Sequence, residues 1–467
     1  MTSRISDAVK QIERCATTPI ITHDDAKIVF NIVNQYFGEF ERSQKFRGAE
    51  VAISPRFYEL LEFFNREQGV FFASQFFLFC YTLAQDYKQV QMPICNHVAL
   101  PYKKWVRNNW RFLEPAVKSI SSGDEYVFVC RHAVTQGPYA PGSSIYTFAN
   151  ALLEADRKVT IICLGHISAQ FGALSNQHSN LTILGLKDAQ LTQRLTTLIE
   201  LLRIIRPKTV LTEIEFDLVS VLSILNPNLP MLFLSPGFYT LPWFDKIGLT
   251  DSLTSDLEIS RSKDFFKIPT YVSNKVLNPP VDDQKVMQLK NLLGLKHNDF
   301  VLGSMARMEK FQKPFLAVLG KVLERCPNTK VVLAGPNDRS PVESALQKFI
   351  ALQRAIVLPV TDAHVLGHCI NLGIDTFPTH SGFSVLELMA KGVPVVAKKD
   401  NDNHTNWGQR IPELMRENDE RLVDLICELA LNPDIHKRYF TASKELLFSN
   451  SNDREFISAL DQAIEAA

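Results

Sequence analysis

The sequence predicts an α/β protein in which an all-α N-terminal domain precedes two facing, doubly wound parallel sheets. Two stretches in which short apolar strands alternate with helices support this prediction, one beginning near residue 125 and the other near residue 299. Such alternation is typical of parallel sheets covered by helices on both faces. The 467 residues are also too many for one hydrophobic core, so several domains are expected.

Residues 1–115 are predicted to form the helical domain, because apolar side chains such as Phe57, Leu60 and Leu61 recur at helical spacing. Residues 68–85 are uncharged and rich in phenylalanine, and their length is near the lower limit for a membrane-spanning helix. Glutamine, serine and threonine side chains interrupt this stretch, so a buried helix is expected. The alternative is a helix that contacts a membrane surface or a partner protein.

The two alternations divide the rest of the chain. The strands EYVFVCR, KVTIICLG, LTILGL, KTVLTEI and PMLFLSP define an N-terminal sheet domain at 120–260. The strands DFVLGSM, KVVLAGP, AIVLPV, GIDTFP and PVVAKK define a C-terminal sheet domain at 261–435, followed by helices at 436–467. Residues 246–298 are expected to join the two sheets. Tandem doubly wound domains place a ligand cleft at the carboxyl ends of both sheets.

Composition narrows the classes of function. Lys plus Arg and Asp plus Glu are equal at 50 each, and this balance argues against a nucleic-acid partner, which calls for a basic surface. The eight cysteines are scattered without a CxxC pair, so buried thiols in a reducing compartment are expected. The first residues are polar and charged and show no signal peptide, so a cytoplasmic location is expected.

The segment DTFPTHSGFSVLELMAKGVPVVAKKD, residues 375–400, is the most informative. It predicts a strand, a tight polar loop, and a helix whose first turn contains Gly382, Phe383 and Ser384. The unpaired N–H groups and the dipole of such a helix start suit a diphosphate. Glu387, one turn further, could accept hydrogen bonds from ribose hydroxyls. The alternative is an ordinary strand–loop–helix crossover with a buried glutamate.

Three segments of the chain match a known group of enzymes. GFSVLELMAKGVPVV resembles the nucleotide-sugar signature of GT-B glycosyltransferases, which have two facing Rossmann-like domains. GSMARMEKF (303–311) and LSPGFYTLPWFDKIGLTD (234–251) are similar to segments of the O-GlcNAc transferase family, glycosyltransferase family 41. Bacterial cytoplasmic N-glycosyltransferases of this type also carry a helical domain before the GT-B pair. The resemblance covers residues 125–440, and it does not include a tetratricopeptide array.

The resemblance implies roles for the residues that match these motifs. Lys310 would neutralise the donor diphosphate and stabilise the leaving group, and Arg307 could assist it. Backbone groups of Pro359, Val360 and Thr361 would face a uracil edge, with His364 beside the base. Glu387 would bind the ribose, and the diphosphate would be surrounded by His380, Ser381, Gly382, Phe383 and Ser384. Each assignment has an alternative without a ligand. Lys310 and Arg307 could be solvated charges, and His364 could be a structural residue on a helix face.

Two absences refine the expected chemistry. The loop Thr379-His380-Ser381 has no acid where many retaining GT-B enzymes carry a glutamate, which favours an inverting enzyme. No Asp-x-Asp motif follows a strand in a suitable place, and His364 with His368 lacks a second pair of ligands. No metal and no cofactor beyond a UDP-sugar donor are therefore expected, because Lys310 and a helix N-terminus can neutralise the leaving group.

The N-terminal sheet should supply the acceptor side. Its first loop follows the strand EYVFVCR and contains His132, which can titrate near neutral pH and is the first candidate for the catalytic base. The alternative is that His132 only holds the loop. The further acceptor-side candidates are Gln136, Glu213, Asp217, Tyr239 and Asp245. Of these, Glu213 and Asp217 could orient the acceptor, act as the base or cap a helix.

These observations predict a glycosyltransferase that moves a hexose or N-acetylhexosamine from a UDP-sugar to a protein or glycan acceptor, with inversion and without a metal. The first alternative is a retaining GT-B enzyme of polysaccharide or glycolipid synthesis. The second is a non-catalytic nucleotide-sugar-binding partner of an active glycosyltransferase.

Overall fold

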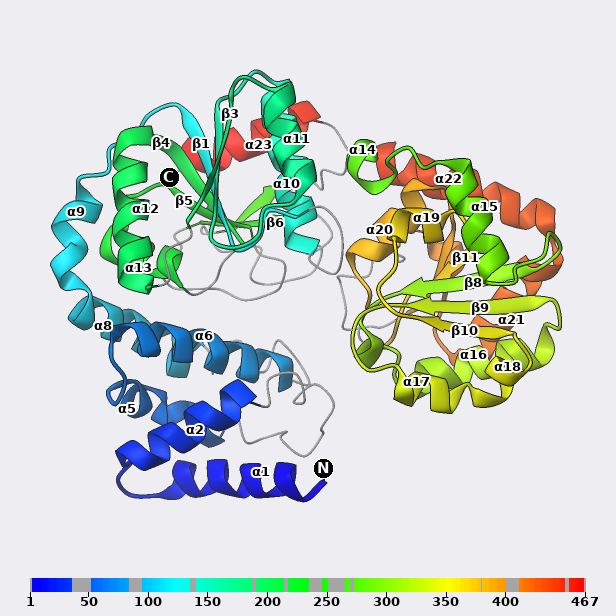
Figure 1. The fold of residues 1–467 in the computed structure, drawn as a ribbon, viewed down its shortest axis with the longest axis horizontal. Helices are drawn as coiled ribbons and strands as arrows, with labels where there is room; N and C mark the ends of the chain where they lie inside the picture. Colours follow the sequence, from blue (N-terminus) through cyan, green and yellow to red (C-terminus); the bar gives the residue numbers. More distant parts are fainter. Residues whose placement is uncertain are drawn as a thin grey trace.

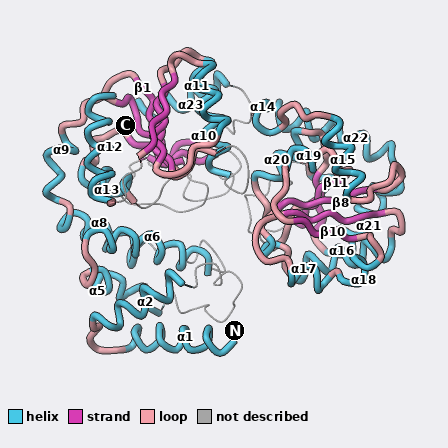
Figure 2. Tube along the Cα trace, in the orientation of Figure 1, coloured by secondary structure: helices cyan, strands magenta, loops and turns pink. Residues whose placement is uncertain are grey.

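The computed structural model describes residues 2–35, 52–83, 95–134, 140–186, 190–213, 217–234, 246–250, 265–268, 273–378, 380–399, 411–449 and 453–465. A helical N-terminal region is followed by two parallel sheets, each covered by helices (Figures 1 and 2). This architecture confirms the predicted fold class.

The helical region buries its aromatic side chains. It contains α1 (Thr2–Thr17), α2 (His23–Gln35), α5 (Phe57–Leu61), α6 (Arg66–Leu83), α8 (Leu100–Asn109) and α9 (Glu114–Lys118). The phenylalanine-rich stretch forms α6, and Phe72, Phe76, Phe77 and Phe79 are almost fully buried, as expected for a core helix. Among the described residues, no helix combines the length and apolar character needed to cross a membrane.

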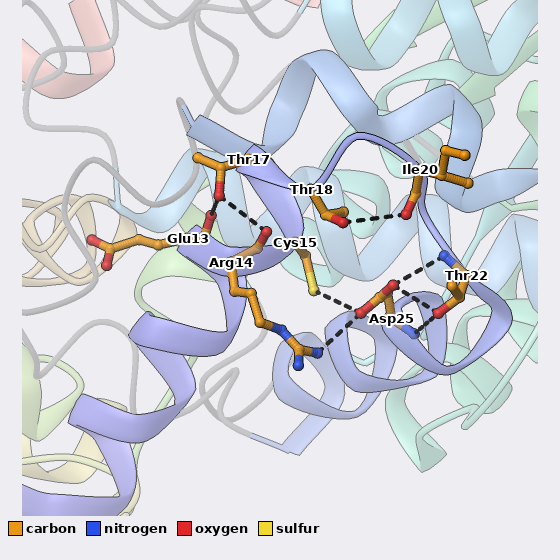
Figure 3. Close-up of polar contacts among 8 residues, drawn as sticks. All are labelled: Glu13, Arg14, Cys15, Thr17, Thr18, Ile20, Thr22 and Asp25. Carbon is orange, nitrogen blue, oxygen red and sulfur yellow. Dashed lines mark hydrogen bonds and ion pairs between the residues drawn. The ribbon is translucent and has the colours of Figure 1, made fainter.

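The corner between α1 and α2 shows how local sequence starts a helix (Figure 3). The Thr22 hydroxyl accepts a hydrogen bond from the Asp25 N–H at 3.2 Å, and Asp25 Oδ2 accepts one from the Thr22 N–H at 3.0 Å. This reciprocal pair is a capping box, which satisfies two N–H groups at the helix start. Arg14 of α1 also forms an ion pair with Asp25 at 3.0 Å, so the two helices are joined at the cap.

The first sheet has seven parallel strands in the order β3-β2-β1-β4-β5-β6-β7. The strands are β1 (Glu125–Cys130), β2 (Val159–Cys163), β3 (Leu181–Gly185), β4 (Pro207–Thr212), β5 (Met231–Leu234), β6 (Lys246–Thr250) and β7 (Phe265–Ile268). The helices are α10 (Ala140–Glu154), α11 (Ala169–Gln177), α12 (Leu191–Ile205) and α13 (Leu218–Leu225). The strands β6 and β7 lie in a region predicted only to join the sheets, because short segments without strong alternation gave no strand signal.

The helical region and the first sheet share one hydrophobic core. The Tyr102 hydroxyl of α8 hydrogen bonds with Ser220 of α13 at 3.0 Å, and Glu67 of α6 accepts from the Thr192 hydroxyl of α12 at 3.0 Å. These contacts attach the helical region to one face of the first sheet.

The second sheet has six parallel strands in the order β10-β9-β8-β11-β12-β13. The strands are β8 (Phe300–Met305), β9 (Thr329–Ala334), β10 (Ala355–Leu358), β11 (Leu372–Ile374), β12 (Val395–Lys398) and β13 (Met415–Arg416). The helices are α14 (Asn274–Leu277), α15 (Asp283–Leu292), α16 (Lys313–Arg325), α17 (Ser340–Ala345), α18 (Gln347–Ala351), α19 (Ala363–Gly367), α20 (Phe383–Ala390) and α21 (Asp419–Leu431). The strand order reverses between β8 and β11, which is where such sheets bind ligands.

The C-terminal helices are divided between the two sheets. Helix α22 (Pro433–Ser449) contacts α20 and α21 beside the second sheet, whereas α23 (Asp453–Glu465) returns to the first. Asp461 of α23 accepts hydrogen bonds from Lys208 of β4 at 2.6 Å and from the Tyr126 hydroxyl of β1. Figure 1 shows α23 in red beside the strands of the first sheet.

The cysteines differ in part from the expectation of thiols. Cys326 at the end of α16 and Cys427 in α21 are paired as a disulfide, so the expectation is wrong for this pair. The two residues are 101 positions apart, and sequence spacing alone does not bring them together. Buried thiols are found at Cys15, Cys80, Cys130, Cys163 and Cys369.

Candidate nucleotide-sugar site

The loop after β11 leads directly into the first turn of α20. Gly382 precedes the helix with φ 71°, a conformation that glycine adopts without strain. Gly382 at the N-cap has no side chain to cap α20, and within the described parts of the chain no side-chain oxygen accepts from the first N–H groups of this helix. A helix start of this kind attracts anions, because its N–H groups and dipole both point outward.

A buried hydrogen-bond network shapes this loop. Asp375 Oδ2 lies 3.0 Å from His380 Nδ1, and Asp375 Oδ1 accepts the Ser381 N–H at 2.8 Å. The side chains of Asp375 and His380 are only 1% and 3% exposed. His380 Nε2 is buried and has no hydrogen-bond partner among the described residues. The loop therefore holds a ring nitrogen that a ligand oxygen could satisfy.

The two predicted phosphate-binding segments meet here. Lys310 follows β8 in a short 3₁₀ turn, and its ammonium donates to the His380 carbonyl oxygen at 2.5 Å. The Ser384 hydroxyl of α20 donates to the Met305 carbonyl oxygen at the end of β8, at 2.6 Å. Arg307 instead pairs with Glu309 at 3.2 Å, and its side chain is 46% exposed. The structure thus brings together Lys310, His380, Ser381, Gly382, Phe383 and Ser384.

A second polar cluster surrounds Lys391, the residue after α20. Its ammonium donates to the carbonyl oxygens of Leu277 at 2.6 Å and Glu387 at 3.1 Å, and it lies 3.3 Å from His364 Nδ1. Burial raises the pKa of Glu387 to about 7 and lowers that of Lys391 to about 8. Burial, and next the Lys391 charge, lower the pKa of His364 to about 4, so its ring is neutral near pH 7.

The residues predicted at the base lie around α19. Pro359, Val360 and Thr361 form the connection from β10 to α19, and Val360 is 51% exposed. Asp362 caps α19 by accepting from the N–H of His364 at 2.9 Å. Since His364 Nδ1 lies 3.3 Å from the Lys391 ammonium, this histidine is held in a protein network. Within the described parts of the chain, no group of three or more His, Cys, Asp or Glu residues could hold a metal.

The acceptor-side candidates follow β1 and β4. His132 Nδ1 accepts from the His166 N–H at 3.2 Å, and burial lowers the pKa of His132. Glu213 Oε1 accepts from the Arg131 N–H at 3.1 Å, so the two loops are joined. Asp217 caps α13 by accepting from the Leu218 N–H at 2.9 Å, and burial raises its pKa. The candidates outside the described residues are Gln136, Tyr239 and Asp245.

Sequence reasoning missed two residues of the site, Asp375 and Lys391. Asp375 is an acid at the carboxyl end of a strand, directly before the phosphate loop, and that position was the available signal. Lys391 occupies the variable position of the Met-Ala-x-Gly motif, where a lysine looks like a solvated surface charge. The structure shows that Lys391 is in fact buried, with 6% of its surface exposed.

Comparison with protein-family models finds no match, and comparison with curated proteins finds none. Solved structures do match. A lysine-to-methionine mutant of the Thermobaculum terrenum O-GlcNAc transferase matches with a TM-score of 0.56 and 14% identity, covering 100% of this chain and 98% of that one. A glycosyltransferase from Rickettsia africae ESF-5 matches with a TM-score of 0.56 and 14% identity, covering 74% of this chain and 99% of that one.

Anabaena HepE, in complex with UDP and glucose, matches with a TM-score of 0.53 and 13% identity, covering 74% of this chain and 100% of that one. These neighbours are glycosyltransferases of the GT-B type, so the chain has the GT-B fold. The match to the O-GlcNAc transferase extends over the helical N-terminal region as well.

Proposed function

We propose that this protein is a glycosyltransferase that takes a hexose or N-acetylhexosamine from a UDP-sugar and transfers it to a protein or glycan acceptor. The observation that carries the proposal is the contact of Lys310 with the His380 carbonyl beside the uncapped start of α20. A fixed cation and a helix N-terminus converge there, and both stabilise the diphosphate that leaves when the sugar is transferred.

The surrounding residues fit the same donor. A phosphate oxygen or a sugar hydroxyl would give the buried His380 Nε2 a partner, which none of the described residues supplies. Glu387, one turn into α20, would accept from the ribose hydroxyls, and His364 with residues 359–361 would border the base. Arg307 would contribute to the field around the phosphates from its half-exposed position. HepE, one of the GT-B neighbours, was solved with UDP and glucose, which supports this class of donor.

We propose an inverting reaction without a metal, because Lys310 and the start of α20 can neutralise the leaving group and the stretch Thr379-His380-Ser381 contains no acid. His132 is proposed as the base, with Glu213 as the competing group. Gln136, Asp217, Tyr239 and Asp245 are proposed for the acceptor side. The full-length match to an O-GlcNAc transferase supports N-acetylglucosamine as one of the candidate sugars.

The decisive experiment is a donor screen by thermal shift with UDP-, GDP-, CMP- and dTDP-sugars. A ligand that binds the native state stabilises it, by about 2.7 kcal/mol when its concentration is a hundred times its Kd. The melting temperature rises as a consequence. UDP-sugars should stabilise the protein more than the others. Transfer is then followed with labelled UDP-glucose and UDP-GlcNAc on candidate proteins, and the anomeric configuration of the product is read by NMR.

The outcomes separate the alternatives. A retained configuration in the product would favour the retaining enzyme of polysaccharide or glycolipid synthesis. Donor binding without hydrolysis or transfer would favour a non-catalytic binding partner. A protein that responds to no nucleotide sugar would contradict the proposed function altogether.

A further inference from the structure

We propose that Lys391 is a positioning residue that fixes His364 in the tautomer with its hydrogen on Nε2, so that the nucleotide meets a hydrogen-bond donor there. This inference rests on the proposed function, because it assigns His364 to the UDP-binding side of the second sheet. It adds a positioning residue that the nucleotide-sugar motif does not specify, because Lys391 stands at the variable position of Met-Ala-x-Gly.

The tautomer follows from the hydrogen-bond inventory. An ammonium group has three donors and no acceptor, so the Lys391 Nζ contact at 3.3 Å is a hydrogen bond only when His364 Nδ1 accepts. The Leu277 carbonyl, which accepts from Lys391, is also the backbone partner of the His364 ring and would accept a ring hydrogen in the opposite tautomer. A neutral imidazole that accepts at Nδ1 carries its hydrogen on Nε2. Burial and the Lys391 charge lower the pKa of His364 to about 4, which keeps the ring neutral at ordinary pH. His364 then offers an N–H to the carbonyl, hydroxyl or phosphate oxygens of a nucleotide.

The ammonium position is fixed by three elements. Its three acceptors are the Leu277 carbonyl of α14, the Glu387 carbonyl of α20 and the His364 ring of α19. The number of acceptors equals the number of ammonium hydrogens, so each contact limits the others. Lys391 itself is 6% exposed, and water therefore competes little for these donors.

Gly367 leaves room for this side chain. A Cβ atom at Gly367 would lie 2.6 Å from Lys391 Cδ and 2.9 Å from Cε, closer than atoms can pack. Gly367→Ala should therefore keep the lysine but move its ammonium away from His364. This variant tests the position of the charge separately from its presence.

The titratable groups that face Lys391 are Glu387 on α20, Asp362 and His364 at the start of α19, and His368 directly after α19. Burial lowers the pKa of Lys391 to about 8. Below that pH the ammonium can only donate, and the tautomer is fixed. Above it the neutral amine can accept a hydrogen from Nδ1, and the constraint on His364 is lost.

The first readout is the tautomer itself, measured without nucleotide by long-range proton–nitrogen NMR on protein labelled with ¹⁵N-histidine. His364→Gln identifies the His364 signals. The unmodified protein should show His364 with its hydrogen on Nε2 below pH 8. Lys391→Met and Gly367→Ala should both show a mixture of tautomers or the other form.

The second readout is UDP affinity by calorimetry between pH 7 and 9. Lys391→Met should weaken UDP binding roughly tenfold, the effect of about one lost hydrogen bond, and should remove the decline in affinity as pH rises through about 8. Lys330→Met is the matched control: Lys330 is 12% exposed and donates to the Gly294 carbonyl at 2.6 Å, in the same domain but without contacting a histidine.

Three results would overturn the inference. An unchanged His364 tautomer in both variants would show that Lys391 does not set it. A changed tautomer with unaltered UDP affinity would remove the positioning role. An equal loss of affinity in Lys330→Met would reduce the effect to packing. Failure of the unmodified protein to bind UDP at all would instead contradict the proposed function, and the tautomer measurement distinguishes the two failures.

Discussion

The Lys310 ammonium lies 2.5 Å from the His380 carbonyl oxygen, and this bond holds the turn after β8 against the loop that enters α20. The two segments are 70 positions apart in the sequence. Their contact places a positive side chain beside the first turn of α20, whose N-cap residue is a glycine and offers no capping side chain. A diphosphate at that helix start would lie within reach of both sources of positive potential.

Lys310→Ala should weaken UDP binding by about 1.5–3 kcal/mol, roughly tenfold to a hundredfold, because it removes a charge-assisted hydrogen bond to the diphosphate. Calorimetric titration with UDP measures the change. Lys313→Ala is the control, since Lys313 is an exposed lysine three positions further on at the start of α16. Equal UDP affinity in Lys310→Ala and the unmodified protein would remove Lys310 from the site.

Glu387→Ala should reduce the preference for UDP over 2′-deoxy-UDP, because the carboxylate is proposed to accept from the ribose hydroxyls. The expected loss is about 1 kcal/mol for UDP and less for the deoxy analogue. Burial raises the pKa of Glu387 to about 7, so the carboxylate gains a proton as pH falls through that value. UDP affinity of the unmodified protein should therefore decline below pH 7, and this decline should be absent in Glu387→Ala. A variant that keeps the full ribose preference would place the hydroxyl contact elsewhere.

His132→Ala should lower the rate of UDP release from the donor about a hundredfold or more while leaving UDP affinity unchanged, as expected for loss of a general base. In the structure His132 Nδ1 accepts the His166 N–H, so Nε2 carries the hydrogen of the neutral ring. Base action at Nε2 requires that hydrogen to move to Nδ1 and the hydrogen bond from the His166 N–H to break. Full turnover in His132→Ala, combined with a loss in Glu213→Gln, would assign the base to Glu213.

Local patterns predicted most of the fold, because buried parallel strands are short apolar runs between turn signals. The apolar run EYVFVC forms β1, and the segment 375–400 forms the predicted strand, loop and helix α20. The strands β6 and β7 were missed, because the pairing of β6 with β5 and of β7 with β6 depends on contacts that no local pattern records. The return of α23 to the first sheet was missed for the same reason.

The site was predictable only where backbone geometry carries the chemistry. The turn before α20 has a positive φ at Gly382, a conformation that favours glycine. The glycine in the sequence therefore indicates this turn directly. Asp375 acts through hydrogen bonds to His380 and Ser381 in the loop that follows it, and Lys391 acts through contacts with α14 and α19. A sequence shows the charge of such residues but not its burial, so an acid in a strand and a lysine after a helix look ordinary. Their roles emerge only once β11, α14 and α19 are placed around them.

The attachment of α23 to the first sheet depends on Asp461, which accepts from Lys208 at 2.6 Å and from the Tyr126 hydroxyl. Asp461→Ala should lower the free energy of unfolding by about 1–3 kcal/mol, because it removes hydrogen bonds to a charged group from a partly buried position. The urea midpoint measures this loss. Glu455→Ala is the control, since Glu455 is exposed on the same helix.

The stability lost in Asp461→Ala should also depend on pH. Burial of Asp461 opposes ionisation, but the hydrogen bonds from Lys208 and Tyr126 prevail and hold its pKa below the ordinary value. A carboxyl group with a lowered native pKa binds fewer protons when folded, so its contribution is present above the unfolded pKa near 3.9 and is lost as pH falls below it. The stability difference between the unmodified protein and Asp461→Ala should therefore be constant from pH 6 to 8 and should shrink below about pH 4. A difference that stays constant down to pH 3, or urea midpoints that coincide at pH 7, would show that Asp461 does not hold α23 to the sheet.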